Sequence, residues 1–277
     1  MNAKQPRSSQ ILKFKTKSAK AKSKSVRTSQ RAPKLECQIA KDATAILEVQ
    51  QFRAKVFGAA YQIEFADGID HDPFDQYSIH VLVRDTQTQK IIACTRVITP
   101  EAKQKLGAYY SESEFQLDDY LQDKKDVYEI GRTCVDEAYR GGNALPVLWM
   151  GMVPLIVEQL KAKHLIGTVS VNLNAAAAKI VATEGYLQHK AKCQKFSSLA
   201  PFDLSAYLGQ QEALFGDIWL NPSEAVKEAH KARSPLYNKK QVPSLIKKYR
   251  RVGAVFSEQG YFDQAFNCVD YFVAIKV

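Results

Sequence analysis

The segment from residue 127 to residue 160 combines a strand pattern, a glycine turn and an apolar helix pattern, an order that can build an anion site. The strand leads through Arg140-Gly141-Gly142 into the helix. Glycines let backbone N–H groups approach a phosphate closely, and the helix N-terminus adds partial positive charge. The turn matches neither the dinucleotide fingerprint nor the P-loop, which disfavours an NAD or ATP enzyme. The alternative is a turn that only connects two elements.

A charged pair, Glu129 and Arg132, lies within the predicted strand Asp126–Val135. Strand alternation places Glu129 and Gly131 on one side, and Tyr128, Ile130 and Arg132 on the other. Such a pair is more often a structural ion pair at a sheet edge than a catalytic group. From the residues alone, the structural interpretation is therefore favoured and the catalytic one stays open.

An acidic stretch precedes the first predicted strands. Its acids and breakers are Glu64, Asp67, Gly68, Asp70, Asp72, Pro73 and Asp75. A solvated loop is the usual structure of such a run. Asp70-His71-Asp72 could hold a cation but lacks the spacing of a metal loop, and the five cysteines include no C-x-x-C pair. We predict no metal site and no disulfide framework.

The periodicity of apolar residues predicts the elements around these candidates. Helices are expected at residues 40–57, 101–106, 144–160 and 175–183, and strands at 80–84, 91–98, 126–135, 165–171 and 272–277. The turn at residues 85–90 predicts a hairpin between the first two strands. Residues 186–242 give only short mixed signals. Hairpin strands followed by alternating strands and helices indicate a mixed α/β or α+β domain.

The net charge of +10 is confined to the N-terminus. Residues 1–35 hold eleven of the 39 Lys and Arg residues and none of the 29 acids, so the remainder is close to neutral. We predict a basic disordered tail at residues 1–36 and a folded domain at residues 37–277. The tail could be a functionless extension, a contact with anionic lipid, a nucleic-acid contact or a transit peptide; the first two are favoured.

The expected cellular location depends on two kinds of segment that are not visible in the sequence. No apolar run reaches the length of a membrane-spanning helix, and no secretory signal is visible. We expect a cytoplasmic protein, with peripheral contact to the inner membrane through residues 1–35 as an option.

Several segments resemble the acyltransferase family that makes N-acylated amino acids from acyl carrier protein thioesters, best known from the ornithine N-acyltransferases of bacterial ornithine-lipid synthesis. They run in family order from about residue 45 to the C-terminus. The matching segments are Phe52-Arg53-x-x-Val56-Phe57, residues 107–115, Glu129-Ile130-Gly131-Arg132-Thr133-Cys134-Val135 with Tyr139-Arg140, Leu148-Trp149-x-Gly151, residues 243–254 and Phe266-Asn267-x-x-Asp270.

The resemblance implies a GNAT-like fold related to acyl-homoserine-lactone synthases, in which a splayed mixed β-sheet is flanked by helices. The acyl-phosphopantetheine arm of acyl carrier protein would lie between the strands at residues 126–135 and 165–171 as co-substrate, with no permanently bound cofactor. Residues 168–200 match the ornithine enzymes poorly, and Arg140-Gly141-Gly142 departs from the usual acetyl-CoA loop. Free coenzyme A is therefore disfavoured as the donor.

The resemblance also implies roles for individual residues. Glu129 would accept the proton of the acceptor ammonium, and Arg132 would meet phosphate or the acidic carrier protein together with Arg140. Arg53 or Arg96 would bind the substrate carboxylate. Asp72 or Asp75 would pair with the side-chain ammonium.

The predicted function is transfer of a fatty acyl group, 3-hydroxylated as in ornithine lipids, to the α-amine of ornithine, giving lyso-ornithine lipid. One alternative is a synthase of another N-acyl amino acid or of an acyl-homoserine lactone signal. The other is a non-enzymatic membrane or nucleic-acid binding module that acts through the tail. For the enzyme we predict acyl carrier protein and a small amino acid as partners, and no nucleic acid.

Overall fold

A mixed β-sheet runs through the protein, for which a computed structural model describes residues 34–174, 177–215 and 240–277. Its order is β1-β2-β3-β4-β5-β9-β7-β6, with β8 paired to β9. The strands are β1 (Leu35–Ile39), β2 (Ser78–Asp85), β3 (Ile91–Ile98), β4 (Val127–Val135), β5 (His164–Asn172), β6 (Lys192–Gln194), β7 (Val255–Ser257), β8 (Tyr261–Asp263) and β9 (Cys268–Lys276). The described helices are α1 (Ala43–Tyr61), α2 (Pro100–Leu106), α3 (Asp118–Leu121), α4 (Ala144–Pro154), α5 (Ala177–Lys190), α6 (Leu204–Phe215) and α8 (Ser244–Arg251).

The predicted hairpin is confirmed: β2 and β3 pair antiparallel from Ser78↔Ile98 to Arg84↔Ile91. The other predicted strands are also present, within a few residues of their expected bounds. Strand β1, which the sequence did not predict, pairs with β2 at the edge of the sheet. It is short and none of its residues is fully buried, so its apolar pattern is weak. The predicted tail at residues 1–36 lies, up to residue 33, outside the described residues.

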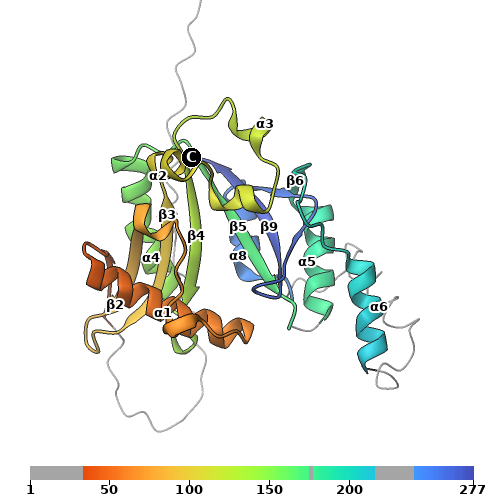
Figure 1. Ribbon diagram of the computed structural model, residues 1–277, viewed down its shortest axis with the longest axis horizontal. Coiled ribbons are helices and arrows are strands. Elements are labelled where there is room, and N and C mark those ends of the chain that lie inside the picture. The colour runs from red at the N-terminus through yellow and green to blue at the C-terminus, as the bar shows by residue number, and fades with distance from the viewer. Residues whose placement is uncertain (1–33, 175–176, 216–239) are drawn as a thin grey trace, which may run out of the picture. The chain divides into compact units, whose positions relative to one another are not determined.

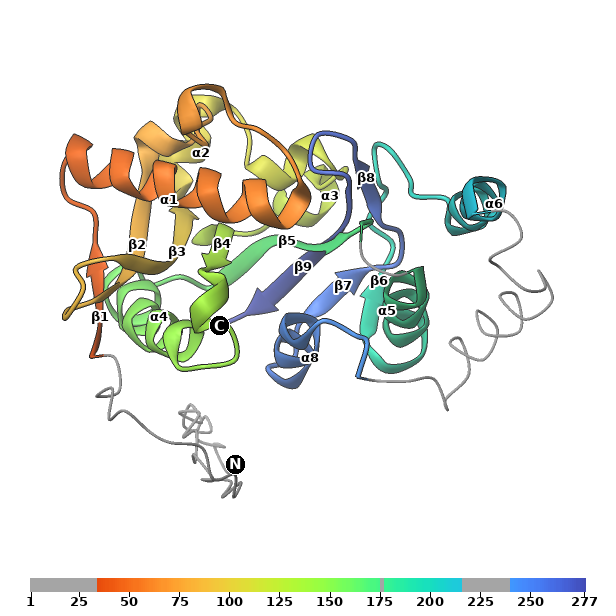
Figure 2. The same ribbon diagram turned by 90° about the horizontal axis from the view of Figure 1, so that it is seen from below.

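Helices cover both faces of the strands β2 to β4 (Figures 1 and 2). Strand alternation divides the core between them: Leu82 and Cys94 pack with α1, whereas Val81 and Ala93 pack with α4. Helix α1 begins at the N-cap Asp42, whose side chain accepts a hydrogen bond from the Ala45 N–H. Its other end reaches the line where β4 and β5 part, and so positions the side chains of its last turns there.

The predicted helix at 144–160 is helical throughout but changes form at Pro154. The α-helical part, α4, ends at Pro154, and a π-helical turn (Leu155–Gln159) follows. Proline lacks the N–H that would continue the α-helical hydrogen bonds, which explains a change of helix type at this residue.

The second half of the sheet is built on β5 and β9, which pair antiparallel from His164↔Lys276 to Asn172↔Cys268. Helices α5 and α8 pack against these strands through residues such as Ile180 and Ile246. Helix α5 begins at Ala177 and continues to Lys190, seven residues beyond the predicted end. Among the described residues, no helix is long and apolar enough to cross a membrane.

Candidate active site

Strands β4 and β5 are parallel neighbours that part after a short contact. They pair at only three positions, from Val127↔His164 to Glu129↔Ile166. Gly167 follows at the point of separation, where an added Cβ would lie 2.3 Å from the carbonyl oxygen of Ile130. Beyond it β4 continues along β3 and β5 continues along β9. The sheet is therefore splayed, as expected from the resemblance.

A bulge in β4 corrects one sequence-based prediction. The β3–β4 register shifts between Cys94↔Cys134 and Arg96↔Gly131, and Arg132 has a left-handed φ of 51°. An extra residue in one strand breaks the alternation of side chains. Arg132 was predicted on the face opposite Glu129, but both contact the same segment: Glu129 accepts the Tyr110 N–H, and the Arg132 guanidinium lies 5.1 Å from the Tyr110 ring centroid.

Three arginines and three aspartates form a buried network beside this bulge. Arg53 donates to both carboxylate oxygens of Asp75 at 2.9 and 2.6 Å, and its Nε lies 2.8 Å from Asp70. Arg96 bridges Asp72 and Asp75 at 2.5 and 2.9 Å. Arg132 completes the network at 3.3 Å from Asp72 and 3.5 Å from Asp70.

The network shifts the pKa values of Asp75 and Arg132. Burial alone would raise the pKa of Asp75, but hydrogen bonds and charges of Arg53 and Arg96 lower this pKa well below its usual value. Burial opposes the charge of Arg132, whereas Tyr110, Asp70 and Asp72 raise the pKa of its guanidinium. The network joins three guanidinium groups to three carboxyl groups, so its formal charges balance.

Glu129 is only 2% exposed and holds the 3-10 turn Tyr110–Ser113 against β4. One of its oxygens accepts the Tyr110 N–H at 2.7 Å; the other accepts the Ser111 N–H at 2.9 Å and the Ser111 hydroxyl. A carboxylate offers about four lone-pair sites, so one is left. Burial raises the pKa of Glu129, which the bonds from Ser111 and Tyr110 partly offset.

A cavity of about 190 Å³ opens where the strands part. One wall comes from β3 and β4 and carries Arg96, Glu129 and Arg132; the other comes from β5, β8 and β9. Of the predicted site residues, Arg53, Asp72 and Asp75 do not line the cavity; Arg53 and Asp75 are buried in the ion-pair network, and Asp72 pairs with Arg96 and Arg132. The structure thus brings six predicted residues together and exposes three of them to the cavity.

The second wall contains acids to which sequence analysis assigned no role. Asp263 and Asp270 line the cavity and are 9% and 3% exposed, with Cys268 beside them. Glu114, 2% exposed, is electrostatically coupled to both aspartates. Burial, followed by their mutual repulsion, raises the pKa of Glu114 and of Asp270. Glu114 and Asp270 lie in segments that carry the family resemblance, and this was the signal in the sequence that could have identified them as site residues.

Asp263, Cys268 and Asp270 also form the one metal-ligand cluster found among the described residues. Their ligand atoms lie within 4.8 Å of one another. The set offers two carboxylates and one thiol. Burial raises the pKa of the Cys268 thiol, and the charge of Asp270 adds to this, so the group is a poor thiolate ligand.

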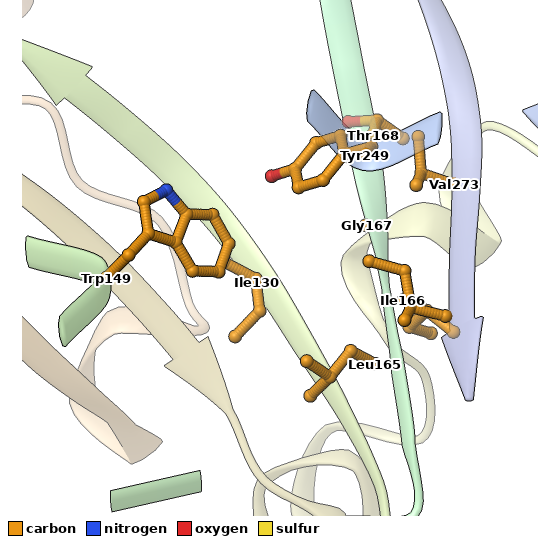
Figure 3. A pocket seen from close by; sticks show the side chains of 9 residues that line it. Ile130, Trp149, Leu165, Ile166, Gly167, Thr168, Tyr249 and Val273 are labelled. Carbon is orange, nitrogen blue, oxygen red and sulfur yellow. The ribbon is translucent and has the colours of Figure 1, made fainter. Parts of the chain in front are cut away.

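A second, apolar cavity of about 20 Å³ adjoins the first and shares Ile130, Thr168 and Tyr249 with it. Figure 3 shows Trp149 on the β4 side and Tyr249 on the β5 side of this gap. Their rings are in edge contact, with centroids 6.0 Å apart. The gap between the strands is therefore polar at the larger cavity and apolar at the small one.

The predicted donor loop lies apart from both cavities. Arg140, Gly141 and Gly142 follow β4 and precede α4, with Arg140 exposed and Gly141 at a left-handed φ of 78°. The Arg140 Nε donates to the Val135 carbonyl at 3.2 Å. The location at the end of β4 agrees with the expectation, and binding by these residues stays a prediction.

The comparisons with known proteins agree with this arrangement. Residues 52–150 match the family model of the GNAT acetyltransferase domain. The L-ornithine N(alpha)-acyltransferase of Rhodobacter capsulatus is 26% identical over 245 residues, which cover 85% of this chain and 87% of that protein. Residues 52–150 therefore form a GNAT acetyltransferase domain, in a chain that is similar to L-ornithine N(alpha)-acyltransferases over most of its length. An enzyme of this kind uses an acyl donor as its co-substrate.

Further relatives of this chain include the L-ornithine N(alpha)-acyltransferase of Brucella abortus, 26% identical over 88% of this chain and 84% of that protein. Among solved structures, the N-acyl amino acid synthase FeeM from uncultured soil microbes aligns with 11% identity and a TM-score of 0.44, covering 89% of this chain and 93% of that chain. The TofI ternary complex aligns with 13% identity and a TM-score of 0.44, covering 87% of this chain and 91% of that one.

Proposed function

We propose that the protein transfers a fatty acyl group from an acyl carrier protein thioester to the α-amine of ornithine. The observation that carries the proposal is the similarity to L-ornithine N(alpha)-acyltransferases over most of the chain, joined to a charged cavity at the parting of β4 and β5. The reaction needs a neutral amine, a thioester carbonyl beside it and groups that hold both.

The amino acid would enter the 190 Å³ cavity with its carboxylate toward the arginine wall. Arg96 suits this role better than Arg53, because Arg96 lines the cavity and its buried Nε has no hydrogen-bond partner, whereas Arg53 is enclosed by Asp70 and Asp75. Arg132 also lines the cavity and is the most exposed of the three, at 15% of its side chain. A guanidinium held by carboxylates is already oriented for a second anion.

Glu129 would take the proton from the acceptor ammonium, directly or through a water molecule. Its remaining lone-pair site and its position on the cavity support this role, and its raised pKa makes it a better base than an exposed carboxylate. The freed amine attacks the thioester carbon, the C–N bond forms and the C–S bond breaks. The amine's second proton leaves with the thiolate, so the products are an amide and the thiol of the carrier arm.

The carrier protein would dock near α8. This helix carries Lys247, Lys248, Arg250 and Arg251 around Tyr249, the residue shared by both cavities. Acyl carrier proteins are acidic, so a basic helix beside the apolar gap suits the donor. Arg140, Gly141 and Gly142 are proposed to contact the phosphopantetheine arm, and residues 1–35 to hold the enzyme near anionic lipid.

The test is incubation of the full-length protein with acyl and 3-hydroxyacyl carrier protein thioesters and a panel of amino acids, with product masses as the readout. We expect an acyl-amide with ornithine. The absence of an acyl-amide with every amino acid contradicts the proposal, and a product from acyl-CoA at equal rate removes the carrier protein as the specific donor.

A further inference from the structure

The acids Glu114, Asp263 and Asp270, here called the acidic wall, have no cation at ion-pair distance in the described part of the chain, although the charge of Arg132 attracts Glu114 and Asp270 from farther away. None of them forms an ion pair with a described Lys, Arg or His, whereas the aspartates of the neighbouring network each contact at least one arginine. Both carboxylate oxygens of Glu114 are buried without any hydrogen-bond partner. Buried acids in this state favour a positive charge brought from outside.

A cationic group of a ligand could reach these acids in the cavity. Asp263 and Asp270 line it directly, and Glu114 lies behind them within electrostatic range. One oxygen of Asp263 is occupied by the Ala265 and Phe266 N–H groups, at 2.8 and 3.1 Å, which holds the carboxylate in position. Asp270 is paired across the ladder with Ser170, and one of its oxygens accepts from the Cys268 thiol at 3.6 Å.

Aromatic rings enclose the same end of the cavity. Phe57, Tyr61 and Phe266 line it, and Phe266 meets the other two rings edge-on at centroid separations of 6.0 and 5.5 Å. Carboxylates framed by aromatic faces are suited to an alkylammonium, because the rings contact its methylene groups and attract its charge. A metal ion would have two carboxylates and a thiol of raised pKa, with the hydroxyls of Ser170 and Tyr61 also on the cavity, so the test below includes a chelator.

We propose that Asp263 and Asp270, supported by Glu114, bind the side-chain ammonium of the acceptor and make the enzyme select an amino acid with a terminal amine. This deepens the proposed function and rests on it. The role replaces the one expected for Asp72 and Asp75, whose carboxylates are engaged by arginines. The amino acid then spans the cavity, with its carboxylate on the β3–β4 wall and its ammonium on the β5–β9 wall.

The test compares ornithine with 2-aminopentanoic acid, the same carbon chain without the terminal amine, as acceptors for the wild type and for Asp270→Asn. We expect the wild type to prefer ornithine at least tenfold in kcat/KM. Asp270→Asn keeps the size and hydrogen bonds of the side chain but removes its charge. It should raise the KM for ornithine about tenfold or more and leave 2-aminopentanoic acid nearly unchanged.

The matched control is Asp119→Asn, an exposed acid on α3, which should alter neither substrate. Thermal unfolding verifies that Asp270→Asn is folded. If this variant does not fold, Asp263→Asn takes its place, and the comparison of the two substrates in the wild type still tests the inference. If the wild type uses both substrates equally, the inference is overturned while the proposed function stands. The inference is also overturned if a metal chelator abolishes the preference for ornithine, because the acidic wall would then act through a metal ion. No acylation of any amino acid overturns the proposed function itself.

Discussion

Two charged regions face each other across the parted strands, and they differ in how their charges are balanced. The network around Arg53, Arg96 and Arg132 contains as many acids as arginines and cancels its own charge. The acidic wall forms no ion pair within the described chain, and only the more distant charge of Arg132 offsets Glu114 and Asp270. A region that is neutral by itself can stabilise the fold without a ligand. The acids of the acidic wall repel one another when they are ionised, and a bound cation would reduce this repulsion.

The largest expected effect comes from breaking the neutral region. Arg53→Ala leaves Asp70 and Asp75 buried with reduced compensation, and we expect a loss of about 3–5 kcal/mol in the free energy of unfolding. Denaturant titration measures it. Lys55→Ala on the same helix is the control: its surface pair with Asp136, at 3.5 Å, should contribute about 0–1 kcal/mol. An Arg53→Ala variant as stable as Lys55→Ala would show that the network does not support the fold.

Glu129 lies between the two regions, and its removal should act on turnover. We expect Glu129→Gln to lower kcat by about 10²–10⁴-fold. Because the base must be ionised, the wild-type rate should rise with pH through the raised pKa of Glu129, and the variant should lose this rise. Circular dichroism checks that the variant is still folded after the change in the hydrogen bonds between residue 129 and the turn at Tyr110 and Ser111. A folded variant with an unchanged rate removes Glu129 from proton transfer.

The separation of the two walls depends on Gly167. A Cβ there would meet the backbone oxygen of Ile130 at 2.3 Å, so Gly167→Ala must shift one strand. We expect a destabilisation of about 1–3 kcal/mol and a reduced acyl-transfer rate. Gly209→Ala, at an exposed helical glycine whose added Cβ meets nothing within 4 Å, is the control and should be neutral or slightly stabilising. Equal behaviour of the two variants would contradict the close packing.

The smallest effect, and one of opposite sign, is expected in the acidic wall. The pKa of Glu114 is raised in the folded state by burial and by Asp270 and Asp263, so the folded protein binds more protons than the unfolded chain above the usual carboxyl pKa. Stability then falls as the pH rises from that value. At pH 8, Glu114→Gln should therefore stabilise the ligand-free protein by about 1–2 kcal/mol, a gain that vanishes near pH 4. A destabilised variant at pH 8 would mean that Glu114 has a partner.

The elements of the fold were predictable where their signals are local. Residues 78–98 form the expected hairpin because a polar turn separates two apolar runs. Strand β1 was not predictable, since it is short and half-exposed. The extension of α5 was not predictable either, because this helix is stabilised by contacts with β9 and α8, which are distant in sequence. A local pattern does not contain such contacts.

The site was predictable in part. The family resemblance selected Arg53, Arg96, Asp72, Asp75 and Glu129, which the fold brings together. The resemblance selected Arg132 as well, but strand alternation gave the wrong face for it, because a bulge with a left-handed residue has no reliable signature in a single sequence. The acidic wall escaped notice because Glu114 and Asp270 are far apart in sequence, and their missing counter-charge is visible only once the cavity is known.

The position of the acyl group on ornithine tests the account most directly. If the acidic wall holds the side-chain ammonium, only the α-amine reaches the thioester beside Glu129. Tandem mass spectrometry of the wild-type product, made from ornithine and an acyl carrier protein thioester, should place the acyl group on the α-nitrogen alone. A product acylated on the side-chain nitrogen would contradict the account.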